Sequence, residues 1–209
     1  MTWLVGALLL LVEPFWQVKP PMEWTDVELA QFLADSPWAQ MSAQPGKAQV
    51  GKNAGSGQPV QVYLATAGPV VKALAERDRR TELRRPGTAK ALADDPLSEE
   101  RAVWFADNRE KHIIVAARVG NNDAFSKEAE TRRLEQDSAM DAGHGRVKLS
   151  AYFPPTSTDP HLYLAFPREL VSPTDKIVSF ELYLPGAPGP YRTLQFKVKD
   201  LLVDGKLEM

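Results

Sequence analysis

One segment alternates between apolar and polar positions and reads Val178-Ser179-Phe180-Glu181-Leu182-Tyr183-Leu184. A period of two places every second side chain on one face of a β-strand, so its apolar positions predict a buried face. A proline- and glycine-rich loop at 185–190 follows. The next segment repeats the pattern with Leu194, Phe196 and Val198. The two segments therefore predict antiparallel strands joined by a chain reversal.

Other segments extend the same sheet. Residues 59–64, 147–153 and 162–166 alternate, and the β-branched run from His112 to Val119 predicts a central strand. Asp204-Gly205 lies between two short apolar segments, which is typical of a two-residue hairpin. Short strands at close spacing with tight turns favour an antiparallel sheet.

Helix signals gather in the first two-thirds of the chain. Thr25 and Glu28 have the spacing of a capping box before a short helix that ends near Asp35. Further helices are expected over 68–85, over 96–108 with Leu97, Trp104 and Phe105 facing inward, and over 121–140 at the surface. The sequence thus predicts an α+β fold: an antiparallel β-sheet or sandwich of about five to seven strands, with two or three helices packed on one face.

The chain divides into three parts by composition. Residues 1–22 are a candidate signal peptide or N-terminal anchor with a linker, residues 23–58 a helical N-terminal extension with a flexible loop, and residues 59–209 a single α+β main domain. The apolar run Leu4–Val12 is too short to span a bilayer but fits the core of a signal peptide. It lacks a preceding Lys or Arg and a following small-x-small site, so a buried N-terminal element is the alternative. We expect export to the periplasm or cell envelope, with the cytoplasm as the other location.

Composition excludes several classes of protein. The 209 residues include 25 Lys plus Arg and 27 Asp plus Glu, a net charge of −2, and no cysteine. Collagen, coiled-coil rods, disordered tails and polytopic membrane proteins do not have this composition. A disulfide framework and cysteine-ligated metal sites are also excluded. The near-neutral charge argues against a nucleic-acid partner.

Two stretches resemble a group of uncharacterised exported bacterial proteins. The first is Phe32-Leu33-Ala34-Asp35-Ser36-Pro37-Trp38-Ala39, and the second is Phe196-Lys197-Val198-Lys199-Asp200-Leu201 followed by Gly205-Lys206-Leu207-Glu208. The resemblance implies export but no activity, cofactor or catalytic residue.

The candidate metal ligands lie in turns beside the predicted strand at 147–153. They are His144, Asp159 and His161, and exposed turn histidines are the alternative interpretation. No Gly-x-Ser-x-Gly elbow or phosphate-binding loop occurs, so we predict no cofactor and no catalytic nucleophile.

The candidate partner-binding residues are one tryptophan and one basic cluster. They are Trp38, Arg79, Arg80, Arg84 and Arg85. The arginines suit phosphate, anionic lipid headgroups or an acidic partner, although interleaved acidic residues favour a solvated helix face. We therefore expect a non-enzymatic, exported or envelope-associated interaction module or assembly subunit. The alternatives are a small-molecule or carbohydrate-binding β-sandwich, with an aromatic surface that includes Tyr152, Tyr163 and Tyr183, and a metal- or carboxylate-dependent hydrolase.

Overall fold

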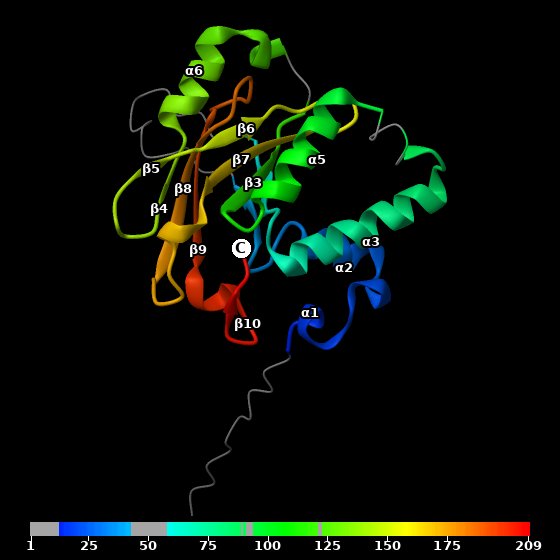
Figure 1. Ribbon diagram of the computed structural model, residues 1–209. Coiled ribbons are helices and arrows are strands. Elements are labelled where there is room, and N and C mark those ends of the chain that lie inside the picture. The colour runs from blue at the N-terminus through cyan, green and yellow to red at the C-terminus, as the bar shows by residue number, and fades with distance from the viewer. Residues whose placement is uncertain (1–12, 43–57, 89, 91–93, 121–122) are drawn as a thin grey trace, which may run out of the picture.

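The computed structural model describes residues 13–42, 58–88, 90, 94–120 and 123–209. Two antiparallel sheets form its centre (Figure 1). The first has the order β1 (Ala39–Ser42), β2 (Val60–Leu64), β3 (His112–Arg118), β7 (His161–Pro167) and β6 (Ala151–Phe153). The second has the order β5 (Val147–Lys148), β4 (Ala139–Asp141), β8 (Ile177–Tyr183) and β9 (Tyr191–Lys197), and β10 (Leu202–Val203) pairs with β11 (Lys206–Leu207).

The α+β class is confirmed, with helices added to antiparallel sheets. The α-helices of the described residues are α1 (Phe15–Val18), α2 (Asp26–Phe32), α3 (Gly68–Arg84), α5 (Pro96–Asn108) and α6 (Glu128–Asp137). Figure 1 shows α3 and α5 on the same side of the first sheet. Among the described residues, no helix combines the length and the apolar character needed to cross a bilayer.

The first sheet is buried on both faces. Phe166 of β7 meets Phe180 of β8 at 5.3 Å between ring centroids, so one face packs against the second sheet. The opposite face carries Tyr63 and Tyr163, and Phe105 of α5 packs on Tyr163. Burial on both sides explains the continuous apolar run of β3, where residues 113–117 are all buried.

The two sheets are linked at both sides. β5 pairs with β4, whereas β6 pairs with β7 in the other sheet, so the predicted strand at 147–153 is divided between the sheets. On the opposite side, Nε2 of Gln40 in β1 donates to the main-chain oxygen of Gln195 in β9 at 2.6 Å. The buried side chains of the two sheets form a single hydrophobic cluster.

Residues 24–42 belong to that core. Trp24, Leu29, Phe32 and Trp38 are buried in the same apolar cluster as the strands, and β1 pairs with β2. The capping box is confirmed, because Thr25 Oγ1 accepts from the Glu28 amide and Glu28 accepts from the Thr25 amide. The predicted loop at 43–57 and residues 1–12 of the predicted signal peptide lie outside the described residues.

Two local predictions were wrong. Leu97 does not face inward but is 48% exposed, because α5 turns Arg101, Trp104 and Phe105 towards the sheet instead. The predicted helix over 121–140 ends earlier, and Met140 is buried in β4, where it pairs with Phe180.

Candidate functional site

A cavity of about 750 Å³ lies between α3, α5 and the helix-covered face of the first sheet. Arg77, Asp78 and Thr81 line it from α3, and Ser98, Glu99, Arg101 and Ala102 from α5. The sheet side is formed by Arg118 at the end of β3, the turn before β7, and the first residues of β7. The volume falls within the range of ordinary small-molecule sites.

A buried carboxylate–imidazole pair stands at the sheet side of this cavity. Nδ1 of His161 lies 2.6 Å from Oδ1 of Asp159, and the two residues are only 6% and 8% exposed. The local turn brings them together, since Oδ1 of Asp159 also accepts from the His161 amide and Thr156 Oγ1 accepts from the Asp159 amide. Contacts within residues 156–161 therefore position the pair without help from residues distant in the sequence.

Two more side chains contact Oδ2, the second carboxylate oxygen of Asp159. Arg101 Nη2 and the Tyr163 hydroxyl each lie 2.9 Å from Oδ2, and the Arg101 guanidinium stands 4.7 Å above the Tyr163 ring. Burial by itself would raise the pKa of Asp159. The His161 hydrogen bond and the nearby His161 and Arg101 groups outweigh burial and lower that pKa to about 2. Asp159 is therefore an anion at neutral pH.

Two tyrosines complete the polar cluster. The Tyr63 ring lies 5.5 Å from the His161 ring, and burial raises the pKa of Tyr63 to about 12. Burial likewise raises the pKa of Tyr163. Both phenols are therefore neutral at pH 7, and the Tyr163 hydroxyl donates its proton to Oδ2 of Asp159.

The hydrogen bond at Nδ1 defines what His161 offers the cavity. A neutral imidazole that donates from Nδ1 to a carboxylate has Nε2 as a free acceptor. Among the described residues, His161 Nε2 has no hydrogen-bond partner. The arrangement can accept a hydrogen bond or a proton from a molecule in the cavity.

No protein-family model, curated protein or solved structure matches this chain.

Only part of the predicted metal set comes together. Asp159 and His161 touch, but His144 pairs at 3.1 Å with Oδ1 of Asp175 and does not line the cavity. Within the described ranges, no group of three or more His, Asp or Glu residues is placed to hold a metal ion. Arg101 and Arg118 carry no signal in the sequence, because α5 and β3 bring them to the cavity from separate parts of the chain.

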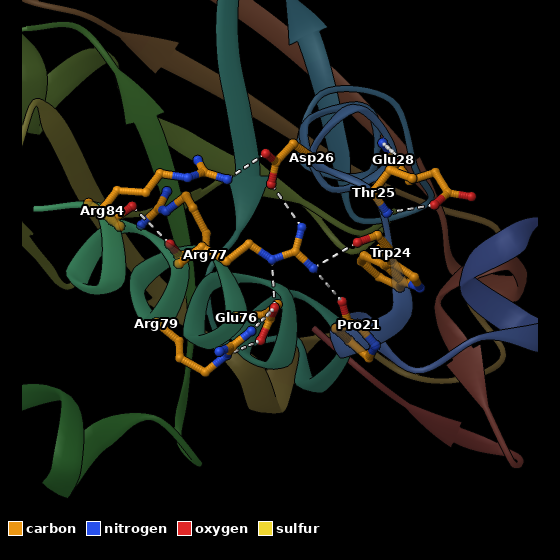
Figure 2. A network of polar contacts seen from close by, with 11 residues as sticks. Pro21, Trp24, Thr25, Asp26, Glu28, Glu76, Arg77, Arg79 and Arg84 are labelled. Atoms are coloured by element: carbon orange, nitrogen blue, oxygen red, sulfur yellow. Dashed lines mark hydrogen bonds and ion pairs between the residues drawn. The ribbon is translucent and has the colours of Figure 1, made fainter.

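The predicted basic cluster connects α3 to the first residue of α2 and to the segment that precedes α2. Arg79 binds Glu76 through two hydrogen bonds of 2.8 Å, and Arg84 pairs with Asp26 (Figure 2). Arg80 contacts Glu76 at 2.6 Å, Asp26 at 2.9 Å and the main-chain oxygen of Trp24 at 2.7 Å. Arg79, Arg80 and Arg84 are therefore engaged by acidic and main-chain groups of the same chain.

The remaining partner candidates differ in exposure. Arg85 is exposed at the end of α3. Trp38 is 5% exposed, and its Nε1 donates to the main-chain oxygen of Glu208 at 2.8 Å. The indole therefore packs in the core and does not form a surface for a partner.

Proposed function

We propose that the protein binds a small polar molecule in the cavity between α3 and α5, and that His161 contacts this molecule. The observation that carries the proposal is the buried cluster of Asp159, His161, Arg101 and Tyr163 beside a cavity of about 750 Å³.

The stability of the fold does not by itself explain why these polar residues are buried together. Buried polar groups stabilise a fold less than apolar groups of the same volume, even when they are well paired. Ionisable groups with shifted pKa values that gather in a cleft are instead common at functional sites. The cluster lies on the face of a sheet whose neighbouring residues Ile114 and Ala116 are apolar and buried, so it departs from the surrounding core.

Binding fits the geometry better than acyl-transfer chemistry. In the described part of the chain, no Ser or Thr hydroxyl is hydrogen-bonded to His161, whereas a hydroxyl nucleophile is activated by a base within that reach. Export and partner binding remain separate proposals, which rest on the N-terminal apolar run and the resemblance described above.

A pair of substitutions on one helix tests the proposal. Ala102 is exposed and lines the cavity, while Ala106 is exposed one turn later and does not. Ala102→Trp places an indole at the mouth, and Ala106→Trp is the matched control. We expect some members of a library of sugars, polyols, carboxylates and phosphates to shift the amide NMR signals of His161 and Tyr163.

The same shifts should persist in Ala106→Trp and disappear in Ala102→Trp. The proposal is wrong if no library member shifts the cavity signals of the unmodified protein. It is equally wrong if Ala102→Trp binds as tightly as Ala106→Trp.

A further inference from the structure

We infer that the molecule bound in this cavity is an acid, whose carboxylate or phosphate group is bound by Arg118 and Arg101. The inference rests on the proposed function and adds the chemical class of the ligand. Its basis is that the buried hydrogen-bond acceptors of the cavity wall are occupied, whereas some of the donors have no partner.

The buried acceptors of the site are already occupied. Oδ1 of Asp159 accepts from the amide and Nδ1 of His161, and Oδ2 accepts from Tyr163 and Arg101. Two hydrogen bonds per oxygen are about the capacity of a carboxylate. A cationic ligand would therefore find no free buried carboxylate at the inner end of the cavity.

Donors, by contrast, are left over. Nη1 of Arg101 is buried and has no partner among the described residues. Arg118 lines the cavity from the end of β3 and forms no ion pair with another described residue. Guanidinium groups offer paired N–H donors that match the oxygens of a carboxylate or a phosphate. Both arginines line the same cavity and have donors to offer an anionic group there.

The remaining acidic residues that line the cavity do not remove this excess of donors over acceptors. Asp78 is engaged by Arg77, whose Nε and Nη2 lie 3.0 and 2.9 Å from Oδ1. Glu99 is exposed in the first turn of α5, where water and salt screen its charge. The inner end of the cavity thus keeps an excess of donors.

His161 adds a second requirement. In the neutral imidazole that donates from Nδ1 to Asp159, Nε2 is an acceptor, and this form of the ring suits a hydroxyl group on the ligand. The class that meets both conditions is a small hydroxylated anion, either a hydroxy acid or the phosphate ester of a polyol.

Calorimetric titration of the full chain with matched probes tests this class. The carboxylate arm compares acetate with glycolate, the phosphate arm compares inorganic phosphate with glycerol 3-phosphate, and glycerol is the neutral probe. We expect the hydroxylated anion of one arm to bind more tightly than its partner and than glycerol, and that arm identifies the anionic group.

Arg118→Gln removes the exposed cation with little effect on folding, and Arg132→Gln removes an exposed arginine of α6 as the control. We expect Arg118→Gln to weaken binding about tenfold, as the loss of a charge-assisted hydrogen bond would, and Arg132→Gln to leave it unchanged.

The inference is overturned if glycerol binds as tightly as glycerol 3-phosphate, or if Arg118→Gln has no effect; the proposed binding function would then stand. If neither these probes nor the wider library shift the cavity signals, both the inference and the proposed function fail.

Discussion

Nε1 of Trp38 donates a hydrogen bond of 2.8 Å to the main-chain oxygen of Glu208, a residue 170 positions later in the sequence. The carboxylate of the same glutamate accepts from the amide of Gly68 at 2.9 Å, at the first residue of α3. A single residue thus connects the segment before β1, the start of α3 and the chain after β11.

We expect Trp38→Phe to destabilise the protein by about 1 kcal/mol, because a partly buried carbonyl loses its donor while most of the ring packing remains. Trp16→Phe is the control, since Trp16 is half-buried and its indole nitrogen donates to no other described residue. Urea unfolding measures both variants. Equal losses would show that the Glu208 contact contributes nothing beyond packing.

Glu76 should make the stability of the protein depend on pH. Hydrogen bonds from Arg79 and Arg80 lower its pKa to about 2 from an ordinary value of 4.5. A pKa lowered by folding stabilises the folded state above the ordinary value, and this stabilisation is lost as the pH falls from about 4.5 towards 2.

The Glu76→Gln variant tests that dependence. We expect it to be less stable than the unmodified protein at pH 7 and to lose less stability between pH 5 and pH 2, as monitored by thermal unfolding across this range. Parallel stability curves for the two proteins would mean that the ion pairs do not respond to acid.

Arg192 is 1% exposed and holds several main-chain oxygens at the β8–β9 turn. Its guanidinium binds the oxygens of Tyr191 at 2.9 Å, Gln58 at 3.1 Å and Pro188 at 3.2 Å, and that of Gly189. Arg192→Met leaves these carbonyls without a donor, so we expect a loss of more than about 2 kcal/mol in chemical unfolding. Arg146→Met, at an exposed position, should change stability by less than about 0.5 kcal/mol. A neutral result at Arg192 would show that the desolvation of its charge cancels these contacts.

The site cluster can be tested by its effect on folding as well as on binding. Asp159→Asn removes the negative charge between Arg101 and His161, and we expect a loss of about 2–3 kcal/mol, typical of charge-assisted hydrogen bonds in buried surroundings. Asp175→Asn is the matched control, because Asp175 also pairs with a histidine, but His144 is exposed. Unfolding followed by tryptophan fluorescence should show a much smaller loss for Asp175→Asn. Similar losses would mean that burial of the Asp159 pair adds nothing.

Signals contained within a few residues predicted the structure well. The Thr25–Glu28 capping box and the Asp204-Gly205 hairpin both form as expected, since each depends on neighbouring residues alone. The division of 147–153 between β5 and β6 was not predictable in this way. Alternation identifies a strand and its buried face but not the sheet to which it belongs.

The candidate site was only partly predictable for a similar reason. Asp159 and His161 are two positions apart, so a local pattern marks them. Arg101 reaches them from α5 and Tyr163 from within β7, and only the packing of α5 on the sheet brings Arg101 to the carboxylate. Trp38 was predicted at a partner-binding surface. Its neighbours in the sequence do not reveal the carbonyl of Glu208, to which its indole donates.

The linkage of the two sheets has a consequence for how the protein behaves at high concentration. Unpaired strand edges act as templates on which other chains add by β-pairing, and this is a common route to aggregation. Here the chain from β5 to β6 joins the sheets on one side, while Gln40 of β1 reaches Gln195 of β9 on the other. At Gln195 the main-chain oxygen already accepts from Gln40, so this position on the edge of β9 is closed to a foreign strand.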